Sequence, residues 1–235
     1  MYSRIFLIER TFKYFLNSRS NLVRLKTYEL SRFVIDQKWL NMRHAEFDKE
    51  KVLRAAMCTF MVNGYAKTSM QDLTKATGLH PGSIYCAFDN KKGLFIAAIE
   101  QYQLDRTQQM QQLFTNERSA LDNLRDYLGL IVQEGLSCDA TQSCLLTKSL
   151  SEMGEQDDQI KQITCEFLQS WHQALSQIFE RAKQQQLIPQ QSDSQFLAQY
   201  LVMGIYGLRT VATTQPCIEV LQPLADKLLR DLISG

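Results

Sequence analysis

The sequence predicts an all-α chain that is divided into a small three-helix head and a larger helical body. Its 235 residues include only ten Gly and four Pro among many Leu, Gln, Ala and Lys, a composition that favours helices. From residue 48 onward, apolar residues recur at helical spacing in most stretches. No stretch shows a convincing alternation of apolar and polar residues, so no strand is predicted. We place the head at residues 46–106 and the body at residues 107–235.

The first helix is predicted over residues 48–63, and Gly64 is expected to end it. Five of its residues lie on one face of a helix and are expected to support the two helices that follow. These residues are Val52, Ala55, Ala56, Thr59 and Phe60.

Residues 68–91 predict two short helices joined by a tight turn. Thr68 and Ser69 offer hydroxyl oxygens to the free N–H groups at a helix start. Gly78 follows the last apolar repeat, where a left-handed cap favours a residue without a side chain. Pro81 suits the first position of the second helix, because the N–H that proline lacks would have no partner there.

The second short helix is predicted to have an inward side and an outward side. Ile84 and Phe88 are four residues apart and are expected to pack inward. Ser83, Tyr85 and Cys86 are expected to face elsewhere. Two helices joined by a short turn with a glycine form the unit that presents a helix to the major groove of DNA. Many helical bundles contain such corners, so the flanking segments decide the interpretation.

With those flanks, residues 48–96 resemble the TetR family of one-component transcriptional regulators. The matching elements, in chain order, are Ala55-Ala56 with Phe60, Gly64-Tyr65, Thr68-Ser69, Gly78-Leu79, Tyr85 with Phe88, and Lys91 before Leu94-Phe95. Two positions depart from the family pattern, since Pro81 stands where Lys is frequent and Lys92 where Glu is frequent. The first departure bears on which operator bases are read, and neither alters the expected fold.

The resemblance implies a TetR-like fold and a DNA-binding transcriptional regulator, by family habit a repressor. It also implies a homodimer in which the last two helices of each subunit form a four-helix bundle. Two-fold pairing places the two recognition helices about 34 Å apart, one turn of B-DNA, so the expected partner is a palindromic double-stranded operator. A small-molecule inducer bound in the body would tilt the helix after the head and move the two heads out of register.

Two sets of head residues are predicted to contact DNA. The first set, to which the resemblance assigns phosphate contacts that orient the head without reading sequence, is Thr68, Ser69, Tyr85 and Lys91. The second set, expected to face the groove, is His80, Pro81, Gly82, Ser83 and Cys86. His80 either contacts a base or only caps the second short helix, and the sequence leaves both open. We interpret Cys86 as a small contact residue, with a thiol sensor as the alternative.

A connecting helix and five body helices are predicted next. Asp89-Asn90 offers an N-cap for the connecting helix, which is expected to run to about Leu113 and to tie the head to the body. The five body helices are predicted over roughly Leu121 to Gly135, Cys144 to Met153, Ile160 to before Pro189, Leu197 to Ala212, and Leu221 to Leu232. Gly204 and Gly207 would let helices approach closely, either between subunits or within one chain.

The body is expected to hold the effector site. Its candidate lining residues are Tyr127, Phe167, Trp171, Met203 and Tyr206. At helical spacing such side chains also suit a plain core, and this alternative stays open.

One body segment, residues 143–148, carries reactive chemistry. Cys144 is predicted at or near a helix N-terminus, where the helix dipole stabilises a thiolate, and Lys148 lies one turn further on, where it would assist. The segment is similar to the Gly-Cys-Leu segment of a TetR subgroup that responds to N-ethylmaleimide, in which the cysteine senses electrophiles. Cys144 is therefore interpreted as either an electrophile sensor or a buried packing residue.

The charge is unevenly distributed along the chain. Residues 42–95 carry eight Lys and Arg against five Asp and Glu, whereas residues 96–235 carry ten against seventeen. A head of net charge +3 on a body of net charge −7 fits phosphate contact by the head alone.

Residues 1–41 are unusual, with eight Lys and Arg against three Asp and Glu. Their apolar run, Ile5 to Ile8, is too short for the core of a signal peptide. Because family members usually start a few residues before the first helix, and Met42 lies six residues before Asp48, we interpret residues 1–41 as an over-long gene assignment. The alternative is a basic arm that grips DNA phosphates.

The cysteine and histidine pattern predicts neither a metal site nor a cofactor. The six Cys form no C-x-x-C pair and have no His at ligand spacing, so neither structural zinc nor a disulfide framework is expected. Free thiols suit a reducing compartment, hence a cytoplasmic protein. The longest run without charge, residues 194–208, is too short to cross a bilayer, so no membrane partner is expected.

Two other classes of function make different demands on the sequence. A thiol enzyme would need Cys144 and His172 as nucleophile and base, but no third orienting group is evident, so the chain is not expected to be an enzyme. An architectural DNA-binding protein without a ligand would bind all duplexes alike, with steep salt dependence. A regulator should prefer its operator by roughly 10³-fold or more.

Overall fold

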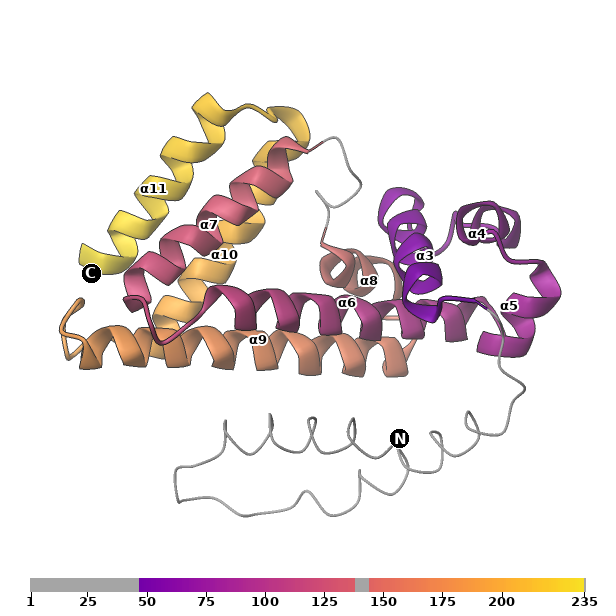
Figure 1. Cartoon of the computed structure of the whole chain (residues 1–235), viewed down its shortest axis with the longest axis horizontal. Coiled ribbons are helices and arrows are strands. Elements are labelled where there is room, and N and C mark those ends of the chain that lie inside the picture. Colours follow the sequence, from indigo (N-terminus) through magenta and orange to yellow (C-terminus); the bar gives the residue numbers. More distant parts are fainter. Residues whose placement is uncertain (1–46, 138–143, 235) are drawn as a thin grey trace, which may run out of the picture. The chain divides into compact units, whose positions relative to one another are not determined.

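The computed structural model describes residues 47–137 and 144–234 as nine helices without a strand, which confirms the predicted all-α class (Figure 1). The interpretation of residues 1–41 as an extension falls outside the described residues. By their contacts, residues 47–137 and 144–234 belong to one compact unit. The helices are α3 (Lys49–Asn63), α4 (Met70–Thr77), α5 (Pro81–Phe88), α6 (Lys91–Leu113), α7 (Ala120–Leu136), α8 (Leu145–Met153), α9 (Asp158–Gln184), α10 (Ser194–Thr214) and α11 (Ile218–Ser234).

Most of these helices begin where a short polar side chain accepts a hydrogen bond from the first turn, which satisfies donors that have no partner within the helix. Such caps are Asp48 for α3, Ser69 for α4, His80 for α5, Asn90 for α6, Ser119 for α7, Asp157 for α9 and Asp193 for α10. Local chemistry therefore sets most helix starts close to the positions predicted from the sequence.

Buried apolar residues form two clusters, and the first, which we name the N-terminal core, joins the head to part of the body. It contains Val52, Leu53, Ala56, Met57, Phe60, Met61, Leu73, Ile84, Phe88, Leu94, Phe95, Ala98, Ile99 and Tyr102 from α3–α6, and Cys144, Leu145, Leu146, Met153, Ile160 and Phe167 from α8 and α9. This packing therefore crosses the predicted boundary at residues 106/107.

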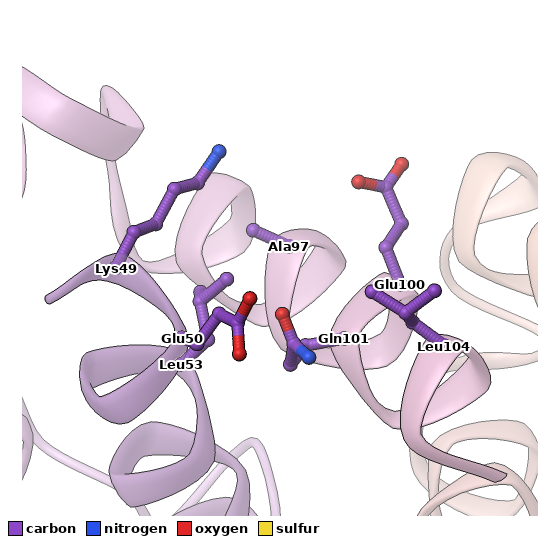
Figure 2. Close-up of a pocket in the computed structure, with 7 residues that line it drawn as sticks. All are labelled: Lys49, Glu50, Leu53, Ala97, Glu100, Gln101 and Leu104. Atoms are coloured by element: carbon purple, nitrogen blue, oxygen red, sulfur yellow. The ribbon is translucent and has the colours of Figure 1, made fainter. Parts of the chain in front are cut away.

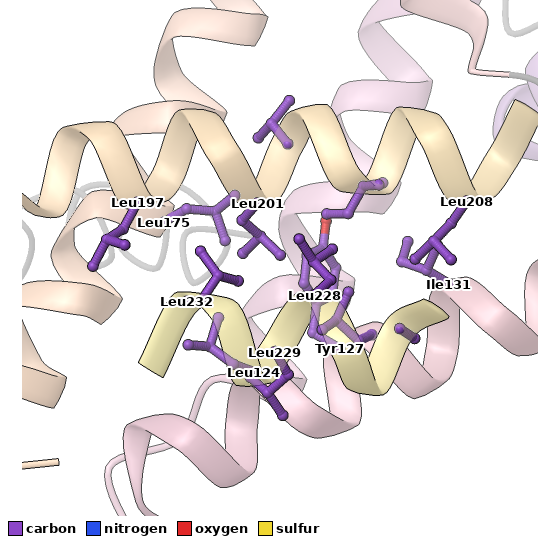
Figure 3. Packing of buried hydrophobic residues seen from close by; sticks show 14 of the residues in the cluster. Leu124, Tyr127, Ile131, Leu175, Leu197, Leu201, Leu208, Leu228, Leu229 and Leu232 are labelled. Atoms are coloured by element: carbon purple, nitrogen blue, oxygen red, sulfur yellow. The ribbon is translucent and has the colours of Figure 1, made fainter. Parts of the chain in front are cut away.

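The second cluster, which we name the C-terminal core, is built from α7, the later part of α9, α10 and α11 (Figure 3). Leu124, Ile131, Leu201 and Leu228 are among its buried members. The buried apolar residues recur at helical spacing on the sides of α7, α10 and α11 that face one another, as expected for amphipathic helices that share a core. None of the helices within residues 47–137 and 144–234 is long and apolar enough to span a bilayer.

The two glycines of α10 have different surroundings. A Cβ atom at Gly204 would collide with the side chain of Leu228 on α11, so this glycine permits a close approach within the chain. A Cβ atom at Gly207 would meet nothing within 4 Å. The sequence left open whether these glycines allow close approach within one chain or between subunits. Gly204 allows it within the chain, whereas the surface of α10 at Gly207 is open.

Candidate nucleic-acid interface

Helix α4 is fixed at its start by a reciprocal pair of hydrogen bonds. The Ser69 hydroxyl accepts from the backbone N–H of Asp72 at 3.1 Å, and the Asp72 carboxylate accepts from the backbone N–H of Ser69 at 2.8 Å. The Ser69 hydroxyl also donates to this carboxylate, and these hydrogen bonds lower the pKa of Asp72. This capping box satisfies two donors that the helix itself leaves open.

The turn between α4 and α5 has the geometry that its glycine and proline predict. Gly78 lies in the left-handed region with φ of 72°, and its N–H donates to the carbonyl of Thr74. Pro81 is the first residue of α5. His80 precedes it, and its Nδ1 accepts a hydrogen bond from Gly82 N at 3.2 Å. His80 therefore does cap α5 through Nδ1, while the residue itself is exposed.

Helix α5 has a buried side and an exposed side, as predicted. Ile84 and Phe88 are buried in the N-terminal core. The exposed residues of α5 that were predicted to face DNA are Gly82, Ser83, Tyr85 and Cys86, with Pro81 half-buried beside them. Because the helix is anchored by its inner residues, the outer ones are presented on a rigid support.

Thr68 does not suit the predicted phosphate contact. Its side chain is only 1% exposed, and its hydroxyl donates to the carbonyl of Gly64 at 2.6 Å. Its backbone N–H also donates to that carbonyl. We therefore correct the prediction, since Thr68 closes the turn between α3 and α4 and presents no donor to solvent. Ser69, the next residue, is exposed.

Lys91, at the start of α6, lies against an aromatic ring of the head. Its Nζ is 4.5 Å from the centre of the Tyr65 ring, a cation–π contact. Burial lowers the pKa of Lys91, and the nearby Glu152 carboxylate opposes that shift. The neighbouring Lys92 turns to the body instead, where it forms an ion pair with Asp157 at 2.5 Å. The two adjacent lysines thus have separate partners.

The aromatic residues predicted to line an effector site are distributed over both cores. Tyr127 belongs to the C-terminal core, and Phe167 belongs to the N-terminal core. Trp171 lies 6.1 Å from Tyr206, centre to centre, and Tyr206 packs against both cores. Burial raises the pKa of Tyr127 to about 12. These four residues therefore lie within or beside the packed interior of the body.

Met203 does not line an interior site, contrary to the prediction. Its side chain is 58% exposed on α10. Apolarity and helical spacing made it a candidate, but these properties do not distinguish an inward stripe from an outward one.

Cys144 lies at the start of α8 as predicted, but its surroundings differ from the expectation. It is only 8% exposed, and Tyr102 Oη donates to its Sγ at 3.8 Å. Lys148 does not assist the thiol, because its Nζ donates to the carbonyls of Met61 and Val62 at 2.7 and 3.1 Å. That part of the prediction is corrected, since Lys148 joins the body to the end of α3.

A half-buried group of charged residues was not predicted from the sequence. Arg106 of α6 and Arg209 of α10 both form ion pairs with Glu134 of α7, the second at 2.7 Å. The Arg106 guanidinium also lies 5.1 Å from the centre of the Tyr102 ring. The three side chains are separated by 28 and 75 residues in the sequence, so no local spacing could have signalled the group.

A solvent-facing hollow of about 320 Å³ lies between α3 and α6. Lys49, Glu50, Leu53, Ala97, Glu100, Gln101 and Leu104 line it (Figure 2). None of the residues predicted for an effector site lines this hollow, and its charged side chains carry both signs, so it supports no particular ligand.

With this geometry established, comparison with known proteins identifies the family. The family model described as "Bacterial regulatory proteins, tetR family" matches residues 52–98. The "HTH-type transcriptional repressor ComR" of Escherichia coli (strain K12) is 30% identical over 78% of this chain and 88% of its own length. The chain belongs to the TetR family. It is a DNA-binding transcription regulator of that family.

A further relative and two solved structures are also similar to this chain. An "Uncharacterized HTH-type transcriptional regulator YezE" of Bacillus subtilis (strain 168) is 26% identical over 78% of this chain and 95% of its own length. A TetR regulator from Chloroflexus aurantiacus has a similar fold, with a TM-score of 0.70 at 19% identity, over 80% of this chain and 94% of that one. A cysteine mutant of the TetR-family regulator CifR, solved with a 26-bp operator DNA, has a TM-score of 0.69 at 23% identity. The match covers 80% of this chain and 98% of that chain.

Proposed function

We propose that this regulator is a repressor that binds a palindromic operator as a homodimer and is released by a small-molecule or electrophile signal. The observation that carries the proposal is that one chain presents two separate exposed surfaces. One is the outer side of α5, and the other is an apolar stripe on α10. The first surface suits a DNA groove, and the second suits a partner subunit. The printed name of the Escherichia coli relative, a transcriptional repressor, supports the direction of regulation.

The α10 stripe consists of residues spaced by four, three and four positions. Phe196 is 61% exposed and stacks on Tyr200 with ring centres 6.3 Å apart, and Met203 and Gly207 continue the row. This spacing places the four residues on one face of a helix. Leu224 adds exposed apolar surface on the neighbouring α11. Such a face on two helices fits the two-fold bundle that the family resemblance implies.

In the proposed complex, the contact residues of the head divide by role. Ser69, Tyr85 and Lys91 contact phosphates and set the orientation of the head. His80, Pro81, Gly82, Ser83 and Cys86 face the major groove. A single eight-residue helix such as α5 offers too few base contacts for specific binding, so two heads about 34 Å apart are required.

For the effector, we propose a site in the body near Cys144, Tyr102 and Tyr206. The Tyr206 hydroxyl is buried and makes no hydrogen bond to the described residues. A buried hydroxyl without a partner is costly, so an incoming polar group that accepts its hydrogen bond would be favoured. Trp171 and Phe167 supply apolar surface close by.

The proposed function is tested by selecting genomic fragments with the purified full-length protein. We expect enrichment of a palindrome, bound roughly 10³-fold more tightly than random duplex. Sedimentation should give a dimer. A monomer that binds every duplex alike, with steep salt dependence, would instead establish the architectural alternative.

The electrophile signal is tested separately with N-ethylmaleimide, in a background where exposed Cys86 and Cys165 are replaced by Ser. Adding Cys144→Ser should keep operator binding but abolish release by the reagent. If the Cys144→Ser protein is still released, Cys144 is a packing residue and the signal acts elsewhere.

A further inference from the structure

Helix α8 forms an end-cap for α3 that is contributed from the body. The last turn of α3 contains no basic residue, and its terminal carbonyls lack partners within the helix. Lys148 supplies the missing cation, because its ammonium group donates to two of these carbonyls, those of Met61 and Val62. A cation at this end also interacts favourably with the helix dipole.

A second residue of α8 contacts the turn that follows α3. Glu152 lies one helical turn beyond Lys148, and its Oε2 accepts from the backbone N–H of Ala66 at 3.3 Å. Gly64 has φ of 81°, and a Cβ atom there would collide with the Glu152 carboxylate. The same carboxylate acts electrostatically on Lys91. Glu152 therefore contacts the backbone that leads from α3 into α4.

The opposite end of α8 lies at the proposed effector site. Cys144 precedes the helix and accepts a hydrogen bond from Tyr102 of α6, four residues before Lys148. A nine-residue helix is only about 14 Å long and behaves as a short rigid rod. Cys144, Lys148 and Glu152 therefore lie together on α8 or at its first turn.

We propose that Lys148 and Glu152 are positioning residues, which hold the DNA-binding head at the angle to the body that the operator spacing requires. This inference rests on the proposed homodimer and its palindromic operator. The two side chains touch no DNA. They act by fixing the end of α3 and the α3–α4 turn.

The test compares operators whose half-sites are separated by the selected spacing or by one or two additional base pairs. The wild-type dimer should lose affinity steeply with each insertion. Lys148→Met and Glu152→Ala release the head, so they should weaken binding to the selected operator by about tenfold, the effect of losing one charged hydrogen bond. They should also reduce the penalty for a longer spacing, which a loss of folded protein alone would not do.

Two matched variants sharpen the result. Lys161→Met removes an exposed lysine of α9 and should leave both affinity and spacing dependence unchanged. Lys148→Arg keeps a cationic donor and should restore most of the spacing dependence, which keeps the test decisive if Lys148→Met folds poorly.

Failure of this inference is distinguishable from failure of the proposed function. If the wild-type protein prefers no duplex, the homodimer on a palindrome is wrong. If the wild-type protein discriminates spacing and both Lys148→Met and Glu152→Ala discriminate it equally, the positioning role is wrong.

Discussion

The α4–α5 unit and the body are both helical, but their polar contacts span very different distances along the chain. In the unit, Ser69 bonds Asp72 and His80 bonds Gly82, within three residues. In the body, Glu134 pairs with an arginine 75 residues away. A surface built from local contacts can be read from a short motif, whereas an interior site depends on the packing of distant helices. The head therefore carries a family signature, and the proposed effector site does not.

The strongest way to test this division is to change the body alone. Met203→Glu places a charge in the exposed α10 stripe, far along the chain from α5, and should prevent pairing of subunits. Because linked binding sites gain about 10²–10⁴-fold in affinity, the monomer should bind the operator weaker by a similar factor. Sedimentation and fluorescence anisotropy measure the two effects. Glu219→Gln, a charge change on the same body, is the control, and an intact dimer in Met203→Glu would refute the assignment of the face.

A second test asks which core supports the head. Leu145→Ala in the N-terminal core and Leu201→Ala in the C-terminal core each remove a fully buried leucine, and each should destabilise the protein by about 3 kcal/mol. Urea unfolding measures that cost. Only Leu145→Ala should accelerate hydrogen exchange in α3 and α6 around Phe95. Equal acceleration by both variants would show that the two cores do not act separately.

A third test removes single contacts of the head. Lys91→Ala should weaken binding to every duplex by about five- to tenfold and lower the salt slope by about one. Tyr85→Phe should weaken binding less, and also without regard to sequence. Titrations of operator and random duplex at several salt concentrations measure both. Unchanged operator affinity in both variants would remove these residues from the interface.

The smallest expected effect concerns the ion pair between the head and the body. Lys92 holds the pKa of Asp157 below its ordinary value, chiefly through their hydrogen bond. A carboxylate with a lowered pKa in the folded state contributes stability above the unfolded pKa of about 3.9, and that stability is lost as pH falls through the folded pKa. Lys92→Met should therefore flatten the fall in stability below about pH 4, measured by thermal unfolding. An unaltered pH profile would show that the pair contributes nothing.

Sequence reasoning was sufficient for the helices and for the buried and exposed sides of α5, because caps and apolar spacing are local properties. Gly78, Pro81 and Ile84 occupy the predicted positions. It was wrong for Thr68, since a hydroxyl at a helix start is equally suited to an internal carbonyl. The family pattern does not reveal which of two adjacent hydroxyls faces outward.

For the body, the same reasoning identified helices but not the direction of every side chain. Met203 and Tyr206 are three residues apart on α10, yet the first is exposed and the second reaches both cores. Lys148 finds its partners 86 and 87 residues earlier in the chain. Such long-range contacts leave no trace in local spacing, which explains why its role was missed.

The shared N-terminal core has a consequence for exchanging parts between relatives. A fragment cut after α6 would expose Tyr102 to water, because Phe167 packs edge-on against its ring and Leu145 and Leu146 belong to the same buried cluster. Transplants that give this protein new operator specificity should therefore carry α8 and the first turns of α9 along with α3–α6. The same constraint applies to natural variation. We therefore expect the residues of α3–α6 and those of α8 and early α9 that pack against them to vary together among relatives.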